Sequence, residues 1–254
     1  MITEETVRTL AARLDTAQHT VTDTLSLADT HTLAVDDAYA VQAALLALRE
    51  GRGERITGVK LGFTSKAKME QMGVSEIIVG RLTDAMCVAD GGGIDLSRFI
   101  HPKVEPEVAY RIGRDVDLDD PDADLVSCVD AVAPALEIID SRYRDFRFTY
   151  EDVVADNTSA AAYVIGAWAP VQDVSDRAVR LSGTSREVAG STEAILGGPV
   201  HALRALLDLA RRRSIPLRAG QVVLAGAATA AIPLERGETT CEVDGVGRVG
   251  VRGI

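Results

Sequence analysis

HPKVEPEVAY, residues 101–110, is the stretch that decides how this chain folds. Its alternating pattern predicts a β-strand, in which every second side chain lies on the same face. Glu105 and Glu107 therefore point the same way, away from Pro106 and its flanking valines. Since Pro106 has no N–H to donate, we expect the strand at a sheet edge or beside a bulge. Two carboxylates on one face repel each other unless a cation lies between them; a solvated pair on an outer face is the alternative.

A third carboxylate lies in AVAPALEIID, residues 131–140. Glu137 is surrounded by apolar residues, where an ionised carboxylate is costly unless it is paired or bound to a metal. Three glutamates without a set of Cys or His ligands indicate a hard cation, Mg²⁺ or Mn²⁺. A salt bridge from Glu137 to a buried Arg or Lys is the alternative. Asp140 falls on the opposite face and is expected to have a different role.

A conspicuous lysine lies in TGVKLGFTSKAK, residues 57–68. Strand alternation places Gly58, Lys60 and Gly62 on one face. Because glycines have no side chain, we expect open space around Lys60, where its ammonium can meet an anionic ligand at close range. A surface lysine on an ordinary strand is the alternative.

The composition excludes several classes of protein. A chain of 254 residues with 46% hydrophobic residues suits one globular domain with a helical annex, not a disordered protein. The formal net charge of −11 argues against nucleic acid as a partner. No apolar run approaches the length of about 18 residues that a membrane span needs. The six aspartates of residues 115–124 predict a solvated turn. Three widely spaced cysteines and an N-terminus without a signal-peptide core predict a cytoplasmic protein without disulfides.

The apolar spacing divides the chain into two parts. It predicts helices over residues 3–16, 36–50 and 199–213, the last with Pro at its first position and three arginines at its end. From about residue 56 onward, short apolar runs between Gly, Pro and Asp predict strands. The expected organisation is therefore an N-terminal helical annex (1–53) on a β-rich body (54–254), an α+β fold.

Four long stretches together resemble a known family. They are TGVKLGFTSKAKMEQMGVSEIIVGRLTDAM (57–86), HPKVEPEVAY (101–110), ALEIIDSRYRDFRFTYEDVVADNTSAAAYVIG (135–166) and LRAGQVVLAGAATAAIPL (217–234). They resemble, in order and over nearly the whole chain, the 2-oxopent-4-enoate hydratase and 4-oxalocrotonate decarboxylase family of the fumarylacetoacetate hydrolase superfamily. The resemblance implies a mixed β-sandwich roll with an N-terminal helical region, and a divalent ion, usually Mg²⁺, on three carboxylates.

The resemblance also assigns roles to single residues. The metal ligands match Glu105, Glu107 and Glu137, the same three carboxylates that the spacing singles out. The catalytic lysine of the family matches Lys60. A serine of the ADN-x-S segment matches Ser159, which is expected to help hold the substrate carboxylate.

The choice within the family is between decarboxylation and hydration. In the hydratase branch, the lysine segment is followed by a motif similar to P-D-[FY]-G. This chain has Ile78 at the Asp position of that motif, as the decarboxylase branch does. Adding water to a double bond needs a group that manages the proton of the water, which an isoleucine cannot do. A nearby acid such as Glu76 could restore hydration. Arg142 or Arg144 is expected to bind the second carboxylate of the substrate, oriented by Asp140; a structural ion pair is the alternative.

The expected reaction is a metal-dependent decarboxylation of a small anionic 2-oxo acid. The leading substrate is 2-oxohex-3-enedioate (4-oxalocrotonate), and the product is 2-hydroxypenta-2,4-dienoate, in the meta-cleavage catabolism of aromatic compounds. A 2-oxopent-4-enoate hydratase is the main alternative, followed by a carbon–carbon hydrolase and a non-catalytic partner subunit. The resemblance further implies a homo-oligomer that can form a complex with a cognate hydratase.

Overall fold

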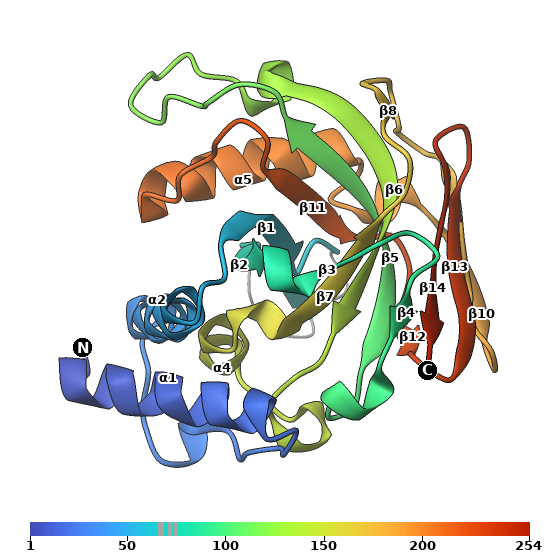
Figure 1. The fold of residues 1–254 in the computed structure, drawn as a ribbon. Helices are drawn as coiled ribbons and strands as arrows, with labels where there is room; N and C mark the ends of the chain where they lie inside the picture. The colour runs from blue at the N-terminus through green and yellow to red at the C-terminus, as the bar shows by residue number, and fades with distance from the viewer. Residues whose placement is uncertain (66–68, 71–72, 74–75) are drawn as a thin grey trace.

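Four α-helices flank the sheets in a computed structural model of the chain (Figure 1), which describes residues 1–65, 69–70, 73 and 76–254. They are α1 (Glu4–His19), α2 (Val35–Gly51), α4 (Tyr150–Ala155) and α5 (Pro199–Arg213). The helices predicted from apolar spacing correspond to α1, α2 and α5, with ends that agree within three residues. The sequence did not predict α4, because six residues are too few to display a helical period.

The larger sheet has nine strands and runs in the order β2-β1-β11-β5-β6-β7-β3, with β12 paired to β5 and β8 paired to β6. Its strands are β1 (Ile56–Gly62), β2 (Ile78–Thr83), β3 (Cys87–Val88), β5 (Lys103–Ile112), β6 (Val129–Ile139), β7 (Ala160–Ile165), β8 (Ala169–Pro170), β11 (Val222–Ala227) and β12 (Ile232–Pro233). The neighbours β1 and β11 are parallel, and β5 is antiparallel to both β11 and β6.

This larger sheet curls into a half-barrel (Figure 1). The curl brings β7 back towards β1, where the Thr57 and Tyr163 hydroxyls lie 3.0 Å apart. The segment before β7 is also tied to β2, since the Asn157 amide accepts from the Arg81 N–H at 2.7 Å and donates to the Arg81 carbonyl at 2.9 Å. The curl therefore gives the sheet an inner face that is enclosed by protein.

The smaller sheet has five strands in the order β10-β9-β13-β14-β4 and stands beside the half-barrel (Figure 1). Its strands are β4 (Gly93–Ile94), β9 (Ala178–Ser182), β10 (Glu187–Ser191), β13 (Gly237–Val243) and β14 (Gly247–Gly253). The mixture of helices with two mixed sheets confirms the predicted α+β class.

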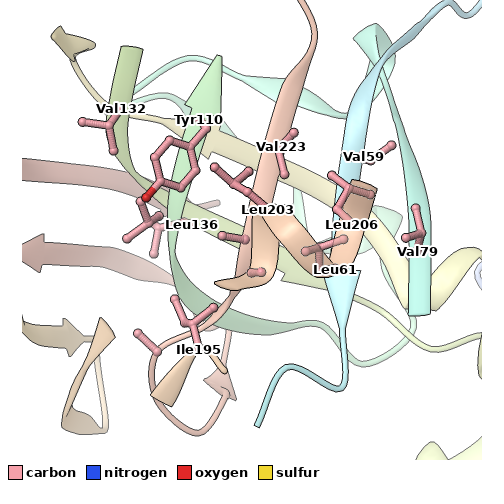
Figure 2. Packing of buried hydrophobic residues seen from close by; sticks show 14 of the residues in the cluster. Val59, Leu61, Val79, Tyr110, Val132, Leu136, Ile195, Leu203, Leu206 and Val223 are labelled. Carbon is pink, nitrogen blue, oxygen red and sulfur yellow. The ribbon is translucent and has the colours of Figure 1, made fainter. Parts of the chain in front are cut away.

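The main hydrophobic core covers the outer face of the half-barrel (Figure 2). Leu203 and Leu206 of α5 pack there on strand residues whose side chains alternate away from the inner face. These residues include Val59, Leu61, Val79, Tyr110, Val132, Leu136 and Val223. Since the apolar side chains take the outer face, Lys60 and the three glutamates, one position out of phase, are left on the inner face.

The helices α1 and α2 pack against α4 and β2 on the other side of the molecule. The side chain of Gln42 on α2 donates to the carbonyls of Val79 (3.0 Å) and Val154 (2.9 Å), and so ties this helix to β2 and α4. None of the described helices is long and apolar enough to cross a membrane. The three cysteines are unpaired, as predicted.

Pro106 predicted that its strand lies either at a sheet edge or beside a bulge. The edge position is wrong, because β5 lies between β11 and β6 in the middle of the sheet, whereas the bulge is present. The register of β11 shifts beside Pro106: Leu224 faces Ala109, but Ala227 faces Glu107. The extra residue on β11 leaves no ladder hydrogen bond for Pro106 to donate. The bulge also aims the Gly226 N–H inward, at 2.7 Å from Oε2 of Glu107.

Candidate metal centre and active site

Three glutamates meet on the inner face of the half-barrel. Glu105 and Glu107 come from β5, and Glu137 lies opposite Glu105 on β6. Each offers a carboxylate oxygen, and these oxygens lie within 4.8 Å of one another. The exposed fractions of the three residues are only 8%, 1% and 0%. The solvated pair considered as an alternative is therefore excluded.

The cluster fits a divalent cation. Glu107 Oε1 and Glu137 Oε2 are buried and have no hydrogen-bond partner among the described residues, although buried polar atoms are normally paired. Burial and the neighbouring charge of Glu137 raise the pKa of Glu107 well above its usual value, and burial likewise raises the pKa of Glu137. Three carboxylates beside one ammonium leave two negative charges uncompensated, which matches the charge of Mg²⁺ or Mn²⁺.

Lys60 lies at the edge of this carboxylate cluster. Its Nζ is 2.9 Å from Oε1 of Glu137 and donates to the Thr158 carbonyl at 3.1 Å. Burial alone would lower the pKa of Lys60, but the charges of Glu137, Glu105 and Glu107 more than offset it, so the pKa is raised. Lys60 is therefore a charged, buried proton donor on the inner face. The salt bridge considered for Glu137 exists alongside the carboxylate cluster and does not replace it.

Neighbouring protein fills the space beside the two glycines that flank Lys60, although Lys60 itself lines a cavity. A Cβ on Gly58 would lie 2.1 Å from the Val222 carbonyl oxygen, so this glycine lets β11 approach β1 closely. A Cβ on Gly62 would lie 2.7 Å from the Thr158 side chain and 2.8 Å from that of Ile78. Gly58 therefore accommodates β11, whereas Gly62 accommodates Thr158 and Ile78 and also lines the cavity.

A left-handed turn presents the partner of Lys60. Asn157, Thr158 and Ser159 have φ angles of 49°, 56° and 58°, a conformation that costs about 1–3 kcal/mol for each such residue. The Asn157 clamp on Arg81 and a hydrogen bond from the Asp140 N–H to the Ser159 carbonyl (2.9 Å) hold the turn. The turn aims the Thr158 carbonyl at Lys60 and brings Ser159 to the wall of the site.

A cavity of about 500 Å³ opens onto this cluster. Its lining includes Lys60, Glu105 and Ser159, together with Ile78, whose exposed fraction is 0%. The structure thus brings these predicted residues to one place, above the deeper Glu107 and Glu137. Ile78 presents an apolar surface where a hydratase would carry an acid. Glu76 is not among the lining residues that the structure describes; it is exposed and pairs with Arg212 at 3.0 Å.

Arg142 has a structural role instead of the expected contact with substrate. It is 1% exposed, is absent from the described cavity lining, and forms an ion pair with Asp156. Its Nη1 donates to the carbonyls of Asp140 (2.9 Å) and Ala160 (3.1 Å), and its Nη2 donates to that of Asp156. Because these bonds use the guanidinium donors inside the protein, the structural ion pair is the correct interpretation, with Asp156 in place of Asp140 as the partner.

Arg144 and Asp140 are also absent from the described lining of this cavity. The exposed Arg144 pairs with Asp23 at 2.9 Å and lines an adjoining cavity, which shares Phe63, Phe146 and Phe148 with the first. Asp140 accepts from the N–H groups of Ile100 (2.9 Å) and His101 (2.8 Å), which fixes the segment that leads into β5. Asp140 therefore lies apart from Glu137, as the alternation predicted, and its contact with an arginine is made by its carbonyl, which accepts from Nη1 of Arg142.

Sequence reasoning missed several groups at the site. Lys103 lines the cavity with its Nζ 3.9 Å from the centre of the Phe146 ring. Its alternation with Glu105 and Glu107 could have placed it there. The Gly226 N–H and the Thr158 carbonyl are backbone groups, and no residue type in the sequence signals their direction.

Comparisons with known proteins agree with the site. The chain is 46% identical over 241 residues to a 4-oxalocrotonate decarboxylase of Pseudomonas sp, with 94% of both chains covered. It is 38% identical over 222 residues to a 2-keto-4-pentenoate hydratase of Paraburkholderia xenovorans (strain LB400), covering 85% of this chain and 82% of the relative. No sequence-family model matches the chain.

Solved structures show the same relationship. The 4-oxalocrotonate decarboxylase from Pseudomonas putida G7, complexed with magnesium and adipate, has a TM-score of 0.94 at 35% identity and covers 100% of this chain and 99% of that one. A putative fumarylacetoacetate hydrolase family protein from Yersinia pestis CO92, with a TM-score of 0.58 and 17% identity, covers 77% of this chain and 92% of that one. This second likeness shows the fold alone.

The curled sheet thus places the chain in the fold class of the fumarylacetoacetate hydrolase family protein, and its buried carboxylate cluster is a candidate site for a divalent cation. Within that class, the chain belongs to the family of 4-oxalocrotonate decarboxylases and 2-keto-4-pentenoate hydratases, and it is a lyase. The family resemblance that the sequence motifs carried is confirmed.

Proposed function

We propose that this protein decarboxylates 2-oxohex-3-enedioate to 2-hydroxypenta-2,4-dienoate with Mg²⁺ or Mn²⁺ in the cage of Glu105, Glu107 and Glu137. The observation that carries the choice of reaction is the apolar Ile78 in the cavity wall, where hydration would need an acid. The relative from Pseudomonas sp, 46% identical, is named for this decarboxylation. The Pseudomonas putida G7 decarboxylase is complexed with adipate, a six-carbon dicarboxylate like the proposed substrate.

The reaction is a loss of carbon dioxide from the carboxylate farthest from the 2-oxo group. When bound, the divalent cation would act as a Lewis acid on the 2-oxo group and its adjacent carboxylate. The breaking carbon–carbon bond leaves its electron pair on the chain, and the pair shifts through the alkene to the 2-oxo oxygen. Lys60 Nζ, held by Glu137 and the Thr158 carbonyl, adds positive charge beside that oxygen and can give it a proton. Ser159 would hold the carboxylate next to the 2-oxo group, which is supported by its position in the cavity wall.

Hydration of 2-hydroxypenta-2,4-dienoate is the second candidate, because relatives named as hydratases are up to 38% identical. Glu76 does not restore the missing acid, since it is exposed and paired with Arg212. A carbon–carbon hydrolase and a non-catalytic subunit find less support, because the carboxylate cluster and Lys60 are in place and the relatives are lyases.

Two incubations separate the candidates. The protein with Mg²⁺ is given 2-oxohex-3-enedioate in one and 2-hydroxypenta-2,4-dienoate in the other. We expect carbon dioxide from the first and little consumption of the second. Consumption of the second compound alone would overturn the proposal in favour of a hydratase.

The metal cage is tested by Glu107→Gln, with Glu238→Gln as a control. Glu107 is 1% exposed within the cluster, whereas Glu238 is an exposed partner of Arg248. We expect Glu107→Gln to lose calorimetric Mg²⁺ binding and turnover while its circular dichroism spectrum is unchanged. Undiminished Mg²⁺ binding in this variant would remove Glu107 from the site.

We further propose that the protein works in the cytoplasm as a homo-oligomer, and that it can associate with a cognate hydratase. The three unpaired cysteines support a reducing compartment. The family resemblance supports the assembly. Size-exclusion chromatography coupled to light scattering, on the protein alone and mixed with the hydratase, would test both assemblies. A monomeric protein that does not bind the hydratase would contradict them.

A further inference from the structure

Lys103 is a second cation of the substrate cavity. It lies on β5 two residues before Glu105, so strand alternation puts both side chains on the same face, and both line the cavity. Alternate residues of a strand are about 7 Å apart. A chelating group held at Glu105 and a carboxylate held at Lys103 would therefore be separated by a distance comparable to the length of a six-carbon chain.

Lys103 and the exposed Arg147 of the neighbouring cavity have no carboxylate partner among the described residues, unlike the other cations near the site. Lys60 is paired with Glu137 at 2.9 Å, Arg142 with Asp156, and Arg144 with Asp23 at 2.9 Å. Within the part of the chain that the structure describes, Lys60 and Lys103 are the two cationic side chains that line the cavity. Lys103 is therefore the cation left to receive an anionic group of a ligand.

The aromatic surroundings hold the Lys103 ammonium in place. Its Nζ lies 3.9 Å from the centre of the Phe146 ring. The Phe146 ring packs in turn against His101, whose ring centre is 4.5 Å away. A cation–π contact attracts the ammonium but does not neutralise it, so its N–H groups stay available. Phe146 and Phe148 also line the cavity, and such an apolar wall strengthens a charge–charge contact.

We propose that Lys103 determines the specificity for dicarboxylates by binding the carboxylate of the substrate that lies far from the metal cage. This inference rests on the proposed function for the orientation of the substrate. It replaces Arg142 and Arg144 in the role that the sequence suggested for them. Because carbon dioxide is neutral, this contact stabilises the bound substrate more than the transition state, so its removal should raise KM without lowering kcat.

The test compares two unreactive ligands, 2-oxoadipate and 2-oxohexanoate, which differ in the distal carboxylate. Their affinities for the Mg²⁺-loaded protein are measured by calorimetry, so the result does not depend on turnover. We expect the wild type to prefer 2-oxoadipate. Lys103→Met should weaken 2-oxoadipate binding by about 10- to 100-fold, with little change for 2-oxohexanoate. Lys103→Arg, which keeps the charge, should restore much of the preference.

Three controls make the result decisive. Arg204→Met, on the exposed surface of α5, makes the same change in net charge and should leave both affinities unchanged. Unchanged Mg²⁺ affinity in Lys103→Met shows that the cage is intact. A dicarboxylate preference that survives in Lys103→Met, or one that is lost in Arg144→Met, would overturn the proposal. Failure of the proposed function has a different readout, the absence of carbon dioxide from wild-type protein.

Discussion

The buried pair of Arg142 and Asp156 offers the sharpest test of how this site is held together. In Arg142→Met the guanidinium is removed while most of the side-chain volume is kept. Asp156, 0% exposed, would then be left as a buried carboxylate without its cation, and the carbonyls of Asp140, Asp156 and Ala160 would each lose a donor. The variant separates a structural role for Arg142 from a role in binding substrate.

The structure sets the size of the effect. Removing one partner of a buried ion pair costs about 3–5 kcal/mol in the free energy of unfolding, because the remaining charge stays out of water. For a chain of this length, this corresponds to a fall of about 6–20 °C in Tm. Arg144→Met is the matched control: Arg144 is 57% exposed, and a surface pair such as Arg144–Asp23 contributes about 0–1 kcal/mol.

The assay is urea unfolding of both variants and of Arg142→Met/Asp156→Leu, followed by circular dichroism. The double variant removes the orphaned charge and should recover part of the lost stability, although the hydrogen bonds from the guanidinium to the three carbonyls are still missing. A loss below about 1 kcal/mol in Arg142→Met would refute the reasoning. A stable variant with a raised KM would return Arg142 to the substrate-binding role.

Three further predictions concern the cage and the thiols. Because burial and the charge of Glu137 raise the pKa of Glu107, a proton competes with the cation, and calorimetric Mg²⁺ affinity should fall as the pH is lowered. A constant affinity would contradict this. Gly226→Ala should lower stability by about 1–3 kcal/mol and weaken Mg²⁺ binding, because the new Cβ would lie 2.1 Å from Thr64 Oγ1 beside the donor to Glu107. Its control, Gly220→Ala, also has a positive φ but meets nothing within 4 Å, so it should leave the affinity unchanged. Native protein should expose one fast-reacting thiol, the exposed Cys87, since burial raises the pKa of Cys241 to about 12 and leaves no thiolate; rapid labelling of Cys241 would contradict this.

The sequence predicted the side chains of the cage because each glutamate conflicts with its surroundings. Period-2 alternation put Glu105 and Glu107 on one face, and the apolar run around Glu137 made an unpaired carboxylate costly. Helices α1, α2 and α5 were predictable for a similar reason, since their apolar spacing extends over several turns.

The remaining parts of the site depend on how distant segments meet. The left-handed turn at residues 157–159 contains no glycine, so the chain shows no local signal for its conformation. Arg142 and Asp156 were both visible as charges, but their pairing is set by the geometry of the turn and not by spacing. The glycines beside Lys60 were expected to leave room for a ligand, but β11 and Ile78 approach them instead, and the sequence does not show which distant segments come close.

The parallel pairing of β1 with β11 has a consequence for how the protein is made. Lys60 leaves the ribosome long before residues 222–227, yet β11 is the strand that lies between β1 and β5 in the finished sheet. During synthesis, Lys60 and the glutamates of β5 therefore cannot take their final positions until β11 has been inserted between them. Pairing between residues so distant in sequence is slow, because a long loop must close first. Metal acquisition should consequently be a late event that follows the insertion of β11.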